Sequence, residues 1–168
     1  YDLENDREIL NQEFSEVGSI YTFKFIPHTD YAVIAGCNGI RIINYRNGQI
    51  KWTGVDLTIR KAVRKAVSLS PDGKEIAFTE VEELDKIYFL DISDLDNMDP
   101  DQEPIGRRVL DENGNPTGLP KNWRLSYTPD GKYLVINSIG RYTLTIIDRH
   151  TMKIVRQYNF GNKAIAMD

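Results

Sequence analysis

The sequence has a single cysteine, Cys37, among its 168 residues. One thiol cannot form an internal disulfide, and alone it cannot supply a thiolate zinc site. Cys37 lies between Gly36 and Asn38, and we expect a small structural residue near a turn, because a reactive cysteine needs a lowered pKa. The count therefore leaves the redox compartment open.

The sequence also lacks an excess of positive charge and a long apolar run. It has 21 Lys and Arg against 25 Asp and Glu, a formal net charge of −4, so we expect no nucleic-acid partner. No apolar run approaches the roughly 20 residues that a helix needs to cross a bilayer, so we expect no membrane insertion. With 40% hydrophobic residues, the chain has enough apolar material for a core.

Catalytic signatures are scarce. The two histidines, His28 and His150, fall in predicted turns of different repeats, whereas a metal site needs several converging ligands. Neither has a Ser or Cys partner at triad spacing. The glycines at 36, 39, 48 and 54 lack the strand and helix that flank a phosphate-binding loop. We therefore predict no catalytic residues, no firm metal site and no resident cofactor in this chain.

What the sequence does contain is an internal repeat. Residues 66–96 and 123–160 align, and each consists of a predicted strand, a Pro-Asp-Gly turn, a strand, a polar turn and a further strand. Residues 19–52 form a more divergent copy, in which Pro27-His28-Thr29-Asp30 replaces the Pro-Asp-Gly turn. Repeats at such a period indicate stacked supersecondary units.

Each copy has the chemistry of an antiparallel meander. In the turns at 71–73 and 129–131, proline presets φ, aspartate bonds to the local backbone, and glycine takes the left-handed conformation. The flanking runs "KEIAF" and "KYLVIN" are short and rich in strand-forming residues. A recurring four-stranded unit of roughly 40 residues predicts an all-β fold of β-propeller blades.

The repeat resembles the YVTN-type β-propeller family, which is WD-like in shape. The best copy, residues 127–161, keeps "TPDGK" and then Ile147, Asp148, Thr151, Lys153 and Gly161. The second copy keeps "SPDGK" and Leu90-Asp91 before a polar insertion, and the first keeps only "YRNGQIKW". The resemblance implies the fold, but it indicates little about activity, because propellers host many functions.

The repeats divide the chain into pieces of one partial propeller domain. These are the end of one blade (1–14), three blades (19–55, 62–112 and 122–160) and the first strand of another (161–168), with a polar insert at 93–121. Propellers close with four to eight blades, so three blades leave an incomplete ring. We expect other polypeptide to complete it, and favour the remainder of a longer chain over identical copies.

The polar insert begins with "SDLDNMDPDQEP". We interpret it as a long surface insertion within a blade. A second hypothesis is a calcium site, since clustered carboxylate oxygens suit that ion, with Asp94, Asp96, Asn97, Asp99 and Asp101 as candidate ligands. The glycine and late glutamate of an EF-hand loop are missing. Trp52 and Trp123, at strand ends, are expected to pack between blades.

The resemblance also implies where a ligand would bind. In such propellers, the loops that enter the first strand of each blade share one face with the loops between the second and third strands. The entry loops here carry Arg60, Lys61, Arg64, Lys65, Lys121, Arg124 and Lys163. A basic channel mouth of this kind would suit an anionic ligand. The other interpretation is a solvated basic loop, as charge runs commonly are.

Three functions remain open, one of which is a peptidase whose propeller only gates access, if the chain is a fragment. The absence of a catalytic set and the open ring favour a non-catalytic binding or scaffold module. The resemblance also allows a fragment of a periplasmic propeller redox enzyme, similar to haem-type nitrite reductases or quinone amine dehydrogenases, whose haem or quinone the basic mouth would receive. A CxxCH haem-attachment motif is absent. Because the family is mostly exported, the resemblance implies a periplasmic or extracellular location.

Overall fold

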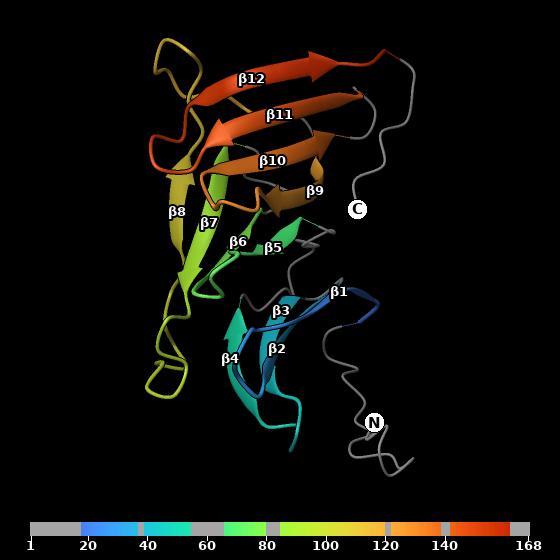
Figure 1. Ribbon diagram of the computed structural model, residues 1–168, viewed down its shortest axis with the longest axis vertical. Coiled ribbons are helices and arrows are strands. Elements are labelled where there is room, and N and C mark those ends of the chain that lie inside the picture. Colours follow the sequence, from blue (N-terminus) through green and yellow to red (C-terminus); the bar gives the residue numbers. More distant parts are fainter. Residues whose placement is uncertain are drawn as a thin grey trace.

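The structure is a computed structural model that describes residues 18–36, 39–54, 66–79, 85–119, 122–138 and 142–161. In these ranges it is all-β, with twelve strands in three four-stranded antiparallel sheets (Figure 1). The prediction of propeller blades in an incomplete ring is confirmed. The predicted partial blade at 1–14 and residues 162–168 lie outside the described residues.

Each blade is a meander in which every strand pairs with the next one along the chain. The first blade contains β1 (Ile20–Phe25), β2 (Tyr31–Gly36), β3 (Gly39–Asn44) and β4 (Ile50–Gly54). The second contains β5 (Val67–Leu69), β6 (Glu75–Phe78), β7 (Lys86–Asp91) and β8 (Ile105–Arg108). The third contains β9 (Asn122–Tyr127), β10 (Tyr133–Ser138), β11 (Thr143–Asp148) and β12 (Ile154–Asn159).

The turn between the first two strands of a blade follows the predicted chemistry. Gly73 and Gly131 have φ of 71° and 69°, the left-handed region that glycine enters without steric cost. Asp72 accepts a hydrogen bond from the Ser70 hydroxyl, which lowers the pKa of its carboxyl. In the divergent first blade, His28 has the positive φ, 61°. The three turns thus share a length but not a backbone conformation.

Most of the core in the described residues lies in two seams, the first between the first and second blades and the second between the second and third. A smaller buried cluster lies on the other face of the first blade. Strand alternation sends Phe78 and Leu90 toward the first blade and Ile87 and Phe89 toward the third. Trp52 lies in the first seam, 2% exposed, and its Nε1 donates to the carbonyl of Gln102 at 2.9 Å. The predicted packing of Trp52 between blades is confirmed, whereas the side chain of Trp123 is outside the description.

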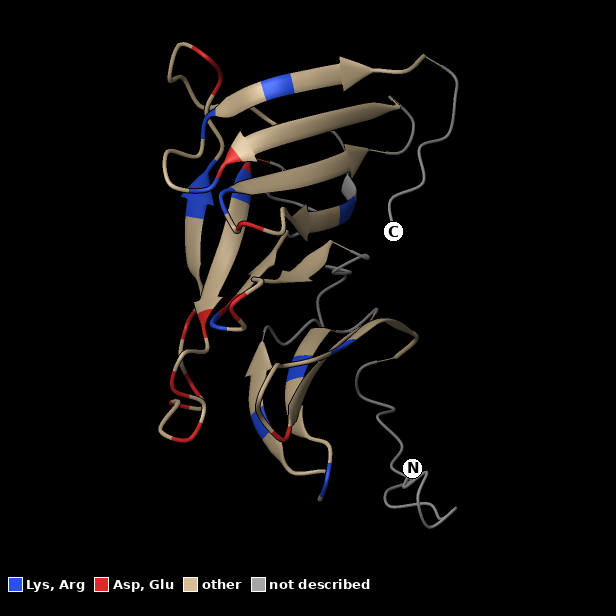
Figure 2. Ribbon diagram, in the orientation of Figure 1, with Lys and Arg blue, Asp and Glu red and all other residues tan. Residues whose placement is uncertain are grey.

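The connection between β7 and β8, residues 92–104, is acidic (Figure 2) but is not wholly a surface loop. Ile92, Leu95 and Met98 are buried in the same hydrophobic cluster as Trp52. The ammonium of Lys51 donates to the carbonyl of Asp96 at 2.9 Å. The insertion therefore joins the second blade to the outer edge of the first, with its carboxylates turned outward and its apolar residues inward.

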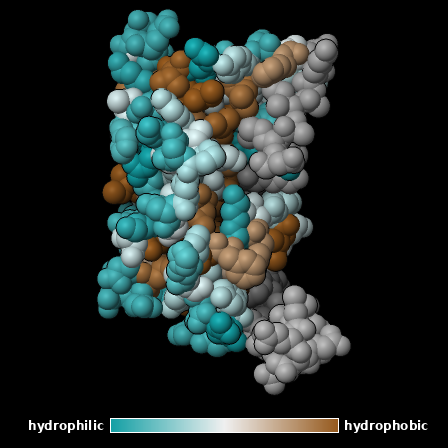
Figure 3. All heavy atoms as spheres, viewed as in Figure 1, coloured by the Kyte–Doolittle hydropathy of each residue, from teal (hydrophilic) through white to brown (hydrophobic). Residues whose placement is uncertain are grey.

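Hydrophobic side chains also emerge between polar ones on the surface (Figure 3). Several belong to the first blade, where Phe23 and Phe25 are 47% and 61% exposed. They lie on the face of that blade opposite the first seam, since they pair with Ile34 and Ala32. This face bears on the function proposed below.

Candidate functional site

An open hollow of about 890 Å³ lies between the Pro-Asp-Gly turns of the second and third blades. One wall carries Pro71 and Asp72, and the facing wall carries Pro129 and Asp130. Side chains from the seam form the remainder: Glu75, Phe89, Tyr127, Arg149 and His150, with Asp91, Ser93 and Ile105 at the margin. Both acidic and basic groups line it, so the hollow has no single sign of charge.

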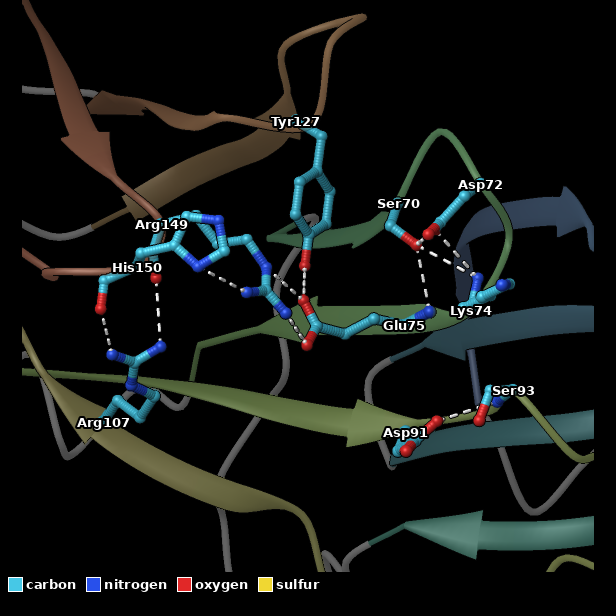
Figure 4. Close-up of polar contacts among 10 residues, drawn as sticks. All are labelled: Ser70, Asp72, Lys74, Glu75, Asp91, Ser93, Arg107, Tyr127, Arg149 and His150. Atoms are coloured by element: carbon cyan, nitrogen blue, oxygen red, sulfur yellow. Dashed lines mark hydrogen bonds and ion pairs between the residues drawn. The ribbon is translucent and has the colours of Figure 1, made fainter.

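The deepest polar groups bond to one another across the seam (Figure 4). Nε of Arg149 donates to Oε1 of Glu75 at 2.9 Å, and Nη2 donates to Oε2. The hydroxyl of Tyr127 donates to the same Oε1. The side chains of Arg149 and Glu75 are only 27% and 17% exposed. A two-pronged pair of this kind fixes orientation as well as adding energy.

Phe89 and Arg107 support this cluster from the second blade. The Arg149 guanidinium lies 5.7 Å from the centroid of the Phe89 ring, a cation–π distance. Arg107 donates to the backbone carbonyls of Arg149 (3.0 Å) and His150. Both contacts hold the turn that carries Arg149 against the second blade.

The electrostatics of Glu75, Tyr127 and Arg149 favour a structural role over a catalytic one, and we call these three residues the clamp. The hydrogen bond to Glu75 raises the pKa of Arg149, so its guanidinium stays charged. Burial and the bond to Glu75 hold the pKa of Tyr127 far above its usual range, so the phenol stays protonated. Both Glu75 oxygens accept hydrogen bonds. The cluster therefore presents neither a free base nor an activated nucleophile.

The predicted basic mouth lies almost wholly outside the described residues. That holds for Arg60, Lys61, Arg64, Lys65, Lys121 and Lys163. Arg124 is described: it is exposed on β9, with its Cα opposite that of Asn137. At the same end of the third blade, the hydroxyls of Ser138 and Thr143 are buried without a hydrogen-bond partner. Whether the cations converge therefore stays a prediction.

The other candidate residues occupy turns. His28 lies in the first turn of the first blade, and His150 lies between β11 and β12, with Nδ1 3.5 Å from Nη1 of Arg149. Among the described residues, no three His, Cys, Asp or Glu side chains form a group that could hold a metal ion. The calcium candidates Asp94, Asp96, Asp99 and Asp101 are exposed and do not form one. Cys37 is outside the description.

Asp94 and Asp99 instead stabilise the local backbone of the insertion. Asp94 accepts bonds from the backbone N–H of Asn97 at 3.3 Å and from its side-chain amide at 3.1 Å. Asp99 accepts a bond from the backbone N–H of Asp101 at 2.9 Å. These are the local turn interactions expected of aspartate.

The residues that sequence reasoning missed are those of the clamp. Glu75 follows the Pro-Asp-Gly-Lys run of the second repeat, where the other two repeats have tyrosine. Arg149 follows the aspartate that ends β11, where the second repeat has Ile92. Comparing the repeats position by position could have identified both as unusual polar residues, although not as partners.

Comparison with known proteins supports the fold and little else. No protein-family model matches the chain, and no curated protein matches it. Among solved structures, 464 chains match. One of them, Kuenenia stuttgartiensis hydrazine synthase, superimposes with a TM-score of 0.58 at 16% identity, covering 84% of this chain and 36% of that one. A likeness at this identity concerns the fold alone. In the part that the structure describes, no helix could span a membrane.

Proposed function

We propose that this chain is a non-catalytic binding or scaffold module that forms one section of a larger β-propeller, with other polypeptide supplying further blades. The observation that supports this is the composition of its two end faces. On the third blade, residues alternating with those of the second seam are Tyr133, Val135, Leu144 and Ile146, all half-buried. Half-buried aliphatic residues on a sheet face are suited to packing against another sheet.

The end face of the first blade has the same character. Ala32, Ile34 and Ile43 form a hydrophobic cluster with Tyr45 at its margin. The ring of the exposed Phe25 meets that of Tyr45 edge to face, 5.2 Å between centroids. No described strand packs on this face. The three aliphatic residues of the cluster are themselves buried, and the exposed apolar side chains of this face include Phe23 and Phe25. Exposed apolar side chains that lie together mark interaction sites.

A charge on one end face provides the test. Ile146→Glu places a carboxylate on the end face of the third blade, whereas Ile105→Glu places one at a site that is already 70% exposed. Each variant replaces the natural chain in its source cells, and native mass spectrometry of the isolated complex follows. The proposal expects Ile146→Glu to lose the additional polypeptide where that is a separate chain, or to lower the thermal unfolding midpoint where it is covalently joined, and Ile105→Glu to do neither. The same effect in both variants, or no effect in either, contradicts the proposal.

The proposed ligand is an anion at the basic mouth, supported by the cations of the entry loops and the exposed Arg124. Inorganic phosphate is a simple probe, titrated by calorimetry into the native protein. Arg124→Gln should weaken binding several-fold, because a charge-assisted hydrogen bond is lost. Arg156→Gln, on the outer strand β12, serves as the control and should leave binding unchanged. Equal effects of the two variants would remove Arg124 from the ligand site.

The alternative is a redox enzyme subunit. The family resemblance allows it, and the likeness to the chain named hydrazine synthase concerns the fold alone. A visible absorption spectrum of the purified native protein distinguishes the two functions: a haem or quinone band would favour the redox subunit. From the family resemblance we also propose a periplasmic or extracellular location, which fractionation of source cells would test.

A further inference from the structure

The three blades share a register that two backbone hydrogen bonds define. The first closes the turn between the first and second strands, from Ile26 to Tyr31, Ser70 to Glu75 and Thr128 to Tyr133. The second follows the third strand, from Tyr45 to Asp30, Ile92 to Lys74 and Arg149 to Lys132. By these bonds Tyr31, Glu75 and Tyr133 are equivalent, and so are Tyr45, Ile92 and Arg149.

At these positions, each seam brings one residue of the preceding blade against two residues of the following blade. The three residues of a seam share the same chemical character. In the first seam, Tyr31 packs in a hydrophobic cluster that contains Leu69 and Ile92. In the second seam, the equivalent Glu75 bonds to the two equivalent residues, Tyr127 and Arg149. The three positions are thus all apolar or aromatic in one seam and all polar in the other.

The first turns of neighbouring blades also meet in a fixed way. A Cβ on Gly73 would lie 3.0 Å from Cδ of Pro27, and a Cβ on Gly131 would lie 3.7 Å from Cδ of Pro71. Both glycines have positive φ. In each seam, therefore, the glycine of the following turn passes over the proline of the preceding one. At Gly73 both the positive φ and the 3.0 Å approach favour a residue without a side chain, whereas at Gly131 the 3.7 Å separation is ordinary contact and the positive φ alone favours glycine.

The end face of the third blade carries the residues that the preceding blade contributes to a seam. Pro129 holds the place of Pro27 and Pro71, and Tyr133 holds the place of Tyr31 and Glu75. Building on the proposed function, we infer that the end face of the third blade seats one further four-stranded blade with glycine in its first turn, over Pro129. The interface continues the register of the two seams already present in the chain.

A second copy of this chain does not fit that description. The first blade that the structure describes in such a copy would be β1–β4, whose first turn has Thr29 in the place of Gly73 and Gly131. The Thr29 hydroxyl donates to the carbonyl of Ile26 at 2.9 Å, so a branched side chain is built into that turn. The occupant is therefore a glycine-turn blade of other sequence.

The test adds a blade of known chemistry after the third blade. A second copy of residues 122–161, fused after Gly161 through a flexible linker in place of residues 162–168, supplies the glycine turn together with the equivalents of Tyr127 and Arg149. We expect the fusion to raise the urea midpoint by about 0.5 M or more, because each added repeat contributes interface free energy. Gly131→Val in the appended copy alone should abolish this gain.

Tyr133→Glu in the parent portion provides an independent variant. It should raise the midpoint of the fusion further, since it recreates the set of Glu75, Tyr127 and Arg149, and it should not raise that of the unfused chain. If neither substitution changes the rise in the urea midpoint of the fusion, the inferred register is wrong but the proposed function stands. No gain in any fusion overturns both. Head-to-tail oligomers of the unfused chain, measured by sedimentation velocity and dispersed by Tyr133→Glu, would overturn the exclusion of a second copy.

Discussion

The guanidinium of Arg149 in the third blade holds the carboxylate of Glu75 in the second, with Nε 2.9 Å from Oε1 and a second bond between Nη2 and Oε2. The two residues are 74 positions apart in the sequence. Their pairing, with Tyr127 as a third member, fixes how the two blades meet. In this account the clamp is an element of assembly, because its groups are already bonded to one another.

Removing one partner of the clamp should destabilise the chain measurably. Glu75→Ala leaves the largely buried Arg149 without its carboxylate, which should cost about 2 kcal/mol in the free energy of unfolding. Asp30→Ala is the control, since it removes only exposed contacts, to Arg46 and to the Tyr45 hydroxyl, and should cost much less. Urea denaturation measures both. Equal losses would mean that the clamp contributes no more than a surface ion pair.

The turn glycines should tolerate substitution unequally. Gly73→Ala introduces a Cβ at positive φ, 3.0 Å from Pro27, and should cost about 1–3 kcal/mol. At Gly118 a Cβ would meet nothing within 4 Å, so Gly118→Ala should change stability by less than about 0.5 kcal/mol. Thermal unfolding compares the two variants. A neutral Gly73→Ala would contradict the close passage of the turns.

The acidic insertion should stabilise the fold through its apolar residues. Leu95→Ala should cost about 2–3 kcal/mol, because Leu95 is 6% exposed beside the cluster of Trp52. Asp99→Ala, in the exposed part of the insertion, should cost well under half of that. Chemical denaturation followed by tryptophan fluorescence measures both changes. Comparable losses would mean that the insertion is held by its turns and not by packing.

Stability should fall in acid. Hydroxyl hydrogen bonds lower the folded-state pKa of Asp72 and Asp130. A depressed folded pKa contributes stability that is present above the unfolded value and is lost as pH falls through the folded one, so the loss should begin below about pH 4. Urea midpoints from pH 6 to pH 2.5 measure it. Asp130→Asn should flatten the profile, and an unchanged slope would contradict this assignment.

The fold could be predicted because its determinants are local. The Pro-Asp-Gly turns and the alternating strands act within a few residues, and Gly73 and Gly131 adopt the conformation that their turns required. The clamp could not be predicted, since it depends on which blade faces which and in what register. The buried Leu95 and Met98 were also missed, because two apolar residues in an acidic run give no periodicity. Of the lysines and arginines predicted to form the basic mouth, the structure describes only Arg124.

The most direct test of the central claim is the native mass of the protein isolated intact from its source. If the chain is one section of a larger propeller, its mass should exceed 19.3 kDa by that of further polypeptide. A folded, stable species of 19.3 kDa alone would contradict the account, because the exposed and half-buried apolar side chains of the two end faces would then remain in contact with solvent.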